Sequence, residues 1–260
     1  MAASTPVPID AERLSGLRRY NLIAGVAHAV QAVLILVLAN GFTLPVTASY
    51  IEGPPGSSKY ETVVLFNTRI ALGVALFFLV SAIAHFWIVS PIGFARYGRD
   101  LAKQQNIARW VEYAISSSIM IVLIAQISSI TNALTLFALF GINAAMILFG
   151  WLQEKYQTPG DGGWLPFIFG CIAGAVPWLC LAFLLIAPGA TGKVTPPAFV
   201  YAIIISLFLF FNVFALNQWL QYKQVGRWKD YLVGERAYIT LSLIAKSLLA
   251  WQVFAGTLAG

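Results

Sequence analysis

Long apolar runs without Asp, Glu, Lys or Arg alternate along the chain with short polar connections. A bilayer core about 30 Å thick is crossed by roughly 20 apolar residues in helical form. One run, residues 113–153, is too long for a single crossing, and the polar stretch 128–132 divides it in two. The pattern predicts helices at about residues 15–40, 63–90, 105–128, 132–156, 163–187, 196–223 and 236–258. We therefore expect an all-α integral membrane protein in which residues 1–260 form one seven-helix transmembrane domain.

The connection between the first two helices has a different pattern. Residues 43–51 and 60–64 are rich in β-branched and aromatic side chains, and they flank Gly-Pro-Pro-Gly at residues 53–56. Such segments on both sides of a Pro/Gly turn are typical of paired strands. We expect a short β-hairpin in the outer loop after the first helix.

Composition narrows the class of protein. Hydrophobic residues make up 59% of the chain and charged residues 10%, against roughly 25% charged residues in a typical soluble domain. A soluble fold of this composition would lack the polar surface to cover itself, and 18 Phe and 8 Trp exclude a disordered chain. The basic residues form no single stripe, so nucleic acid is not an expected partner. The expected environment is the lipid bilayer.

The distribution of positive charge predicts how the helices are oriented. With seven crossings, 12 of the 16 Lys and Arg residues fall on the face that carries the N-terminus. The opposite face holds Lys59, Arg69 and Lys193, and Lys246 lies inside the last helix. Cytoplasmic connections are enriched in Lys and Arg. We therefore expect a multi-pass protein of the cell membrane with a cytoplasmic N-terminus and an extracellular C-terminus.

Two charged residues within the predicted helices are candidates for chemistry, since an unpaired charge in hydrocarbon costs several kcal/mol. Lys246 lies ten residues into the last helix, and Glu112 lies near the cytoplasmic end of the third. At about 1.5 Å per residue their depths differ by roughly 7 Å, which a lysine side chain spans. A buried lysine amine can form a Schiff base with an aldehyde, and a carboxylate would be its counter-ion. Two other interpretations stay open: Lys246 and Glu112 form only a structural pair, or Glu112 pairs with Arg109.

Further polar residues accompany this pair. Ser116 and Ser242 each lie one turn from one of the two charges, on the same helix face. His28 is near the middle of the first helix, and His85 is near the cytoplasmic end of the second. Two histidines near the level of an intramembrane Glu indicate a hydrated, titratable cavity on the cytoplasmic side. The sequence has no metal-ligand spacing and no nucleophile–base–acid pattern, so we expect neither a metal site nor an enzyme.

Two helix faces could form an apolar slot that leads to Lys246. The face of the sixth helix at positions i, i+3 and i+7 carries Phe211, Phe214 and Gln218. The same spacing in the fourth helix joins Asn143, Met146 and Gly150. The glycine would leave room for a ring, although the aromatic side chains could instead face lipid. Gly170 and Gly174 have the spacing of a close-packing motif, which could form a dimer face.

Several motifs match those of a known family. A lysine in the middle of a seventh helix, with a carboxylate in the third, is typical of retinal-binding rhodopsins. More specific motifs are RWVEY at residues 109–113, SSS at 116–118, ILFGWLQEKY at 147–156, and GERAY at 234–238 followed by Ser242 and Lys246. With these motifs the sequence resembles the heliorhodopsins over essentially its whole length. The inverted orientation of that family, with a cytoplasmic N-terminus, agrees with the distribution of positive charge.

The resemblance implies a cofactor and a set of site residues. All-trans-retinal would bind covalently as a Schiff base on Lys246, with Glu112 as counter-ion. Ser242 would form a hydrogen bond near the Schiff base, and His28 and His85 would belong to a cavity that takes part in proton movements after illumination. Other residues implied to lie near the chromophore are Ser81, Tyr113, Ser116, Ser117, Met120, Asn143, Met146, Gly150, Phe211, Phe214, Gln218 and Trp251. Family members are typically dimers, so a homodimer is expected.

The function expected on this basis is light sensing. Light absorption by retinal would start a slow photocycle without net ion pumping, with signalling to a cytoplasmic partner through the basic segments 96–109 and 223–236. Two alternatives stay open: a light-gated ion channel or transporter, and a retinal-free membrane scaffold. A visible band that appears on addition of retinal and is bleached by hydroxylamine would exclude the scaffold.

Overall fold

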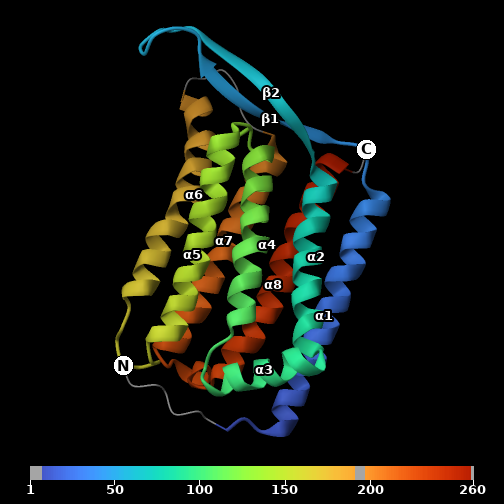
Figure 1. Cartoon of the computed structure of the whole chain (residues 1–260), viewed down its shortest axis with the longest axis vertical. Coiled ribbons are helices and arrows are strands. Elements are labelled where there is room, and N and C mark those ends of the chain that lie inside the picture. The colour runs from blue at the N-terminus through green and yellow to red at the C-terminus, as the bar shows by residue number, and fades with distance from the viewer. Residues whose placement is uncertain (1–7, 191–196, 259–260) are drawn as a thin grey trace.

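The computed structural model describes residues 8–190 and 197–258, and its long helices run side by side as a bundle (Figure 1). In chain order the elements are α1 (Ala11–Leu38), β1 (Thr43–Ile51), β2 (Tyr60–Arg69), α2 (Ile70–Val89), α3 (Pro91–Ala102), α4 (Ile107–Ile127), α5 (Ala133–Tyr156), α6 (Leu165–Ala190), α7 (Ala198–Tyr222), η1 (Gly226–Lys229), α8 (Tyr231–Val253) and η2 (Phe254–Leu258). Within the described ranges, α1, α2, α4, α5, α6, α7 and α8 are each long and apolar enough to cross a membrane. The predicted seven-helix membrane bundle is confirmed.

The two ends of the bundle differ in what covers them. We call the end with the start of α1, with α3 and with η1 the N-terminal end, and the other the hairpin end (Figure 1).

Several helices begin at a polar side chain that accepts an unpaired backbone N–H of the first turn. The capping residues of α1, α4, α5 and α8 are Asp10, Asn106, Asn132 and Asp230. Because Asp230 caps α8, this helix begins at Tyr231 rather than near the predicted residue 236.

The buried apolar side chains form separate clusters toward the two ends of the bundle. α1 packs on α2, α2 on α4, α4 on α5, α5 on α6, and α7 on α8, which also contacts α1. Toward the hairpin end, side chains from these helices form the largest apolar cluster, with Ile35, Phe78, Ile121, Leu207 and Leu249 among its fully buried members. A second apolar cluster, which includes parts of α1, α3 and α8, lies toward the N-terminal end. The buried charged residues described below lie on α4, α5 and α8.

The predicted hairpin after the first helix is confirmed and is longer than expected. β1 and β2 pair in antiparallel register from Thr43 opposite Arg69 to Ile51 opposite Tyr60. β2 therefore occupies the first residues of the helix predicted at 63–90, and α2 begins only at Ile70. The backbone N–H of Thr47 donates to the carbonyl oxygen of Thr131 at 2.8 Å, which ties the hairpin to the connection between α4 and α5.

An additional short helix, α3, was not expected from the apolar runs. It lies across the N-terminal end of the bundle, between α2 and α4 (Figure 1). Ser90 accepts the backbone N–H of Gly93 at 3.2 Å, and Pro91 occupies the first turn, where its missing N–H costs nothing. The side chains of Tyr97 and Leu101 are buried against the bundle. α3 is thus an integral part of the fold.

Candidate functional site

The centre of the candidate site is an ion pair between α4 and α8. Lys246 Nζ donates to Glu112 Oε1 at 3.0 Å and to Ser242 Oγ at 2.6 Å, and both charged side chains are buried. Ser81 on α2 donates to the same Glu112 oxygen at 2.6 Å. Lys246 Nζ also lies over the ring of Tyr113, 5.0 Å from its centroid. The carboxylate and the aromatic face stabilise a positive charge at Nζ in this apolar environment.

The alternative pairing of Glu112 with Arg109 is not found. The guanidinium of Arg109 instead forms ion pairs with Glu154 on α5 and Glu235 on α8, and all three side chains are buried. We call these three residues the buried charge cluster. Asn106 Nδ2 donates to Glu235 Oε1 at 2.8 Å, and Trp110 Nε1 donates to Glu154 Oε2 at 2.6 Å. The sequence interpretation missed this cluster because all three residues fall near predicted helix ends, where a charge normally reaches water.

The two histidines lie together, beside the ion pair. Their rings are stacked with centroids 5.5 Å apart, and His28 also contacts the ring of Phe78. His85 Nδ1 is 2.8 Å from Asn21 Oδ1, whereas neither ring nitrogen of His28 has a hydrogen-bond partner in the described part of the chain. A small cavity of about 20 Å³ is lined by polar groups that include His85, Glu112 and Glu235. This space is enough for roughly one water molecule, and polar partners for it are present.

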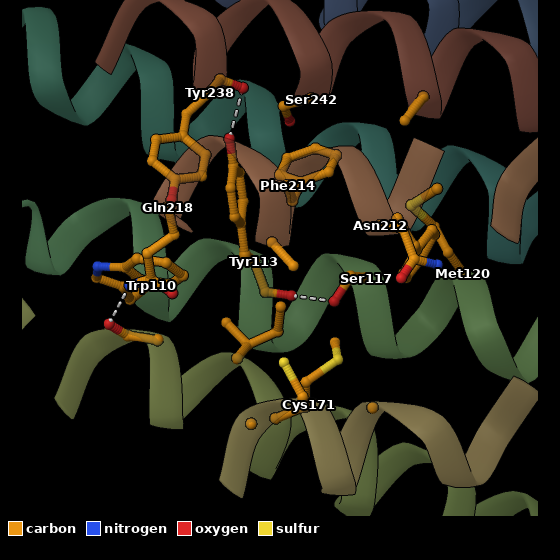
Figure 2. Close-up of a pocket in the computed structure, with 18 of the residues that line it drawn as sticks. Trp110, Tyr113, Ser117, Met120, Cys171, Asn212, Phe214, Gln218, Tyr238 and Ser242 are labelled. Atoms are coloured by element: carbon orange, nitrogen blue, oxygen red, sulfur yellow. Dashed lines mark hydrogen bonds between the residues drawn. The ribbon is translucent and has the colours of Figure 1, made fainter. Parts of the chain in front are cut away.

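A much larger cavity, of about 330 Å³, opens from Lys246 toward α5, α6 and α7. Figure 2 shows its lining, in which aromatic rings of α4, α7 and α8 face sulfur-containing side chains. Of the residues named from the sequence, those that line it are Tyr113, Ser117, Met120, Met146, Gly150, Phe211, Phe214, Gln218, Ser242 and Lys246. The size is within the usual range of small-molecule pockets. An apolar cavity with one amine at its wall fits an elongated apolar aldehyde.

Several named residues do not line this cavity. Asn143 lies behind it and donates to Ser117 and Ser118 at 2.9 and 3.0 Å. Trp251 lies toward the hairpin end, where its Nε1 donates to Gln31 Oε1 at 3.1 Å. Glu112 belongs to the ion pair itself, and the remaining residues lie near the pair on α1, α2 and α4: His28, Ser81, His85 and Ser116.

The structure adds lining residues that the sequence interpretation missed. These include Trp110, Phe167, Cys171, Trp178, Phe208, Asn212 and Tyr238. Helical spacing could have found two of them, because Trp110 precedes Tyr113 by three residues and Tyr238 precedes Ser242 by four. The residues of α6 carry no such signal, since nothing in the sequence indicates which face of that helix turns toward Lys246.

Glycines give the cavity its shape. A Cβ atom on Gly150 would lie 2.5 Å from the indole of Trp110, and one on Gly174 would lie 2.5 Å from Met146 Sδ. A Cβ on Gly170 would lie 3.3 Å from Phe149 Cβ. The small-residue motif of α6 therefore packs against α5 within the chain.

Comparison with known proteins adds the family to this geometry. The heliorhodopsin family profile matches residues 17–258. The chain belongs to the heliorhodopsin family. A search of curated protein sequences finds no match to it. Membership supports a multi-pass membrane protein that senses light through a retinal chromophore, and the cavity beside Lys246 fits that group.

Solved structures similar to this heliorhodopsin support the fold. A light-driven proton pump from Leptosphaeria maculans superposes with a TM-score of 0.64 at 11% identity, over 96% of this chain and 98% of that one. The rhodopsin of Exiguobacterium sibiricum superposes with a TM-score of 0.59 at 17% identity, over 92% of this chain and 94% of that one. At these identities the similarity shows a shared helix arrangement, and it carries no statement about transport.

Proposed function

We propose that this heliorhodopsin is a light sensor that binds all-trans-retinal through an imine to Lys246 Nζ, with Glu112 as the counter-ion. The observation that carries the proposal is the position of Lys246. Its amine is buried at the wall of the 330 Å³ cavity and is paired with Glu112. A purely structural ion pair would need no cavity beside it, so this arrangement favours a cofactor site over a scaffold.

The protein side chains have separate roles in this proposal. Retinal, when bound, supplies absorption of visible light and isomerisation. Glu112 holds the positive charge at Nζ in the dark, and Ser81 and Ser242 fix the geometry of that contact by their hydrogen bonds. The aromatic side chains around the cavity exclude water and restrict the shape available to the chain of the cofactor. His28, His85 and the small polar cavity offer groups that can accept a proton near Glu112.

The output proposed is a signal rather than ion transport. The polar groups near Glu112 lie toward the N-terminal end of the bundle, and the positive-inside rule assigns that end to the cytoplasm. A proton that leaves Nζ would stay on this side and return, which gives a slow photocycle without net pumping. We propose a cytoplasmic signalling partner and a homodimer in the cell membrane.

Reconstitution with retinal tests the cofactor assignment. We expect purified protein to gain a visible band with all-trans-retinal, and hydroxylamine to bleach it. Lys246→Ala and Lys246→Arg should both stay colourless, because neither side chain can form the imine. The exposed Lys103→Arg is the matched control and should give the normal band. A normal band from either Lys246 variant would remove the assignment, and no band from the unaltered protein would favour the scaffold.

A further inference from the structure

Helix α3 presents two different faces at the N-terminal end of the bundle. Gly93, Tyr97 and Leu101 form its buried face. The exposed side carries, at helical spacing, Ile92, Arg96, Arg99 and Lys103. We call these four residues the α3 stripe. The stripe is thus on the exposed side of a helix that lies across the N-terminal end of the bundle (Figure 1).

The stripe is basic and little compensated. Within the described residues, the stripe has an ion pair between Arg96 Nε and Asp100 Oδ2 at a loose 3.8 Å. Ile92, at the N-terminal end of the stripe, is 82% exposed. Two other basic residues at this end are engaged, since Arg13 pairs with Asp230 and Lys223 lies over the ring of Trp164. An exposed apolar residue next to exposed cations has the composition of a contact surface for an acidic partner.

The buried face of α3 is connected to the candidate site by hydrogen bonds. Tyr97 donates its hydroxyl to Glu235 Oε1 at 3.0 Å and accepts from Asn21 Nδ2 at 3.4 Å. Burial and the neighbouring Glu235 carboxylate raise the pKa of Tyr97 well above its usual range, so the phenol keeps the proton it donates. Asn21 also contacts His85, which lines the small cavity together with Glu112. A polar chain therefore leads from the counter-ion to α3.

Contacts at the junction between α2 and α3 hold the start of α3 firmly against the end of α2. Arg18 donates from Nε and Nη2 to the carbonyl oxygen of Val89 at 3.1 and 2.7 Å, which closes the C-terminus of α2. Its guanidinium lies over the ring of Phe94, 4.8 Å from the centroid. Gly93 lies against the backbone of Trp87 with no space for a side chain. A change in the Tyr97–Glu235 contact would therefore tilt α3 rather than unwind it.

We propose that the α3 stripe docks an acidic surface of a cytoplasmic protein, and that Tyr97 makes this docking depend on light. The inference rests on the proposed light-sensing function and names the surface and the charge of the partner. A protein is favoured over anionic lipid because α3 lies across the N-terminal end of the bundle, between the membrane helices α2 and α4, rather than along the side of the bundle (Figure 1). Tyr97 acts as a positioning residue. It contacts neither the 330 Å³ cavity nor the pair of Lys246 and Glu112, and its hydrogen bond to Glu235 holds α3 to the buried charge cluster.

A binding experiment on the pigment in nanodiscs of neutral phosphatidylcholine tests the surface. The probe is a fluorescein-labelled decaglutamate peptide, measured in the dark. Arg96→Gln combined with Arg99→Gln should weaken binding about fivefold, as expected for loss of two exposed charge contacts. The matched control is Arg227→Gln combined with Lys229→Gln, which removes the same charge from exposed positions in η1 and should change binding less than twofold. Equal losses in the two double variants would overturn the proposal.

Illumination tests the link through Tyr97. We expect light to change the affinity for decaglutamate in the unaltered pigment, and Tyr97→Phe to abolish this difference while it keeps the visible band. A light effect that survives in Tyr97→Phe, or none in the unaltered pigment, would overturn the link. Where Tyr97→Phe gives no pigment, Asn21→Leu interrupts the same chain one residue earlier. Failure of the unaltered protein to form a visible band with retinal would instead contradict the proposed function, so the two failures are distinguishable.

Nanodiscs that contain phosphatidylglycerol separate a protein partner from lipid. If the stripe faces the cytoplasm, the difference between the two double variants should persist in these membranes. If anionic lipid occupies the stripe, decaglutamate binding should become insensitive to Arg96→Gln with Arg99→Gln, and the proposal fails.

Discussion

Arg109 and Glu112 lie within one turn of each other on α4, yet each pairs with charges on different helices. Glu112 faces a single cation, Lys246, so that pair is neutral. Arg109 faces two carboxylates, Glu154 and Glu235, so the buried charge cluster is negative overall when both are ionised. Buried charges of this kind are expensive unless every partner is present. The pair of Lys246 and Glu112 is suited to respond to a change of charge. The buried charge cluster is suited to hold α4, α5 and α8 in register.

Replacing Glu112 tests its role as counter-ion. A carboxylate next to the imine holds positive charge at the nitrogen in the ground state, and excitation moves that charge away. Glu112→Gln should therefore give a red-shifted pigment, a near-ultraviolet deprotonated one, or a mixture set by pH, because the favourable partner of the protonated form is lost. Absorption spectra recorded across a pH titration measure this. A spectrum and a titration identical to those of the unaltered pigment would mean that another group is the counter-ion.

Replacing Arg109 tests the buried charge cluster. Arg109→Gln leaves two carboxylates buried without their cation, which should cost about 3–5 kcal/mol of stability. The exposed Arg96→Gln removes the same charge from the surface and should cost at most about 1 kcal/mol. Loss of the visible band on heating, followed in detergent, compares the two. Equal thermal stability of both variants would contradict the structural role of the cluster.

At the scale of elements, the sequence predicts what depends on apolar length and fails where tertiary contacts decide. The membrane helices and the hairpin follow from runs of apolar and β-branched residues. α3 was missed because Arg96, Arg99 and Asp100 interrupt the apolar run, although Ser90 and Pro91 are a normal helix start. The burial of Glu235 was missed for a related reason, since it depends on Tyr97 and α3 covering that end of the bundle.

The junction between α2 and α3 offers a test of this packing. A Cβ atom on Gly93 would overlap the carbonyl oxygen of Trp87, which is backbone and cannot rotate away. Gly93→Ala should destabilise the pigment by about 1–3 kcal/mol, the usual cost of overpacking. Gly98→Ala is the control on the same helix, because its Cβ would meet only the flexible side chain of Leu14 at 3.2 Å. Thermal bleaching of the two variants measures the difference, and a Gly93→Ala pigment as stable as Gly98→Ala would show that the junction is not tightly packed.

At the scale of the whole molecule, the distribution of polar groups along the bundle differs between its halves. From Lys246 toward the N-terminal end lie the small polar cavity, the histidines and the buried charge cluster. Toward the hairpin end, the described helices pack the largest apolar cluster around α8. The polar contact between Trp251 and Gln31 in that half involves no group that titrates. A proton released near Lys246 therefore has acceptors in one direction and an apolar layer in the other.

This asymmetry predicts that illumination does not drive net proton transport. Crossing the apolar layer would cost a bare charge several kcal/mol, so the proton should leave and return on the N-terminal side. Cells that contain the pigment should show no sustained light-induced pH change in suspension, with or without a protonophore, whereas cells with a light-driven proton pump serve as the positive control. A steady photocurrent under voltage clamp would show a conducting path through the hairpin half, and it would favour the channel or transporter over the sensor.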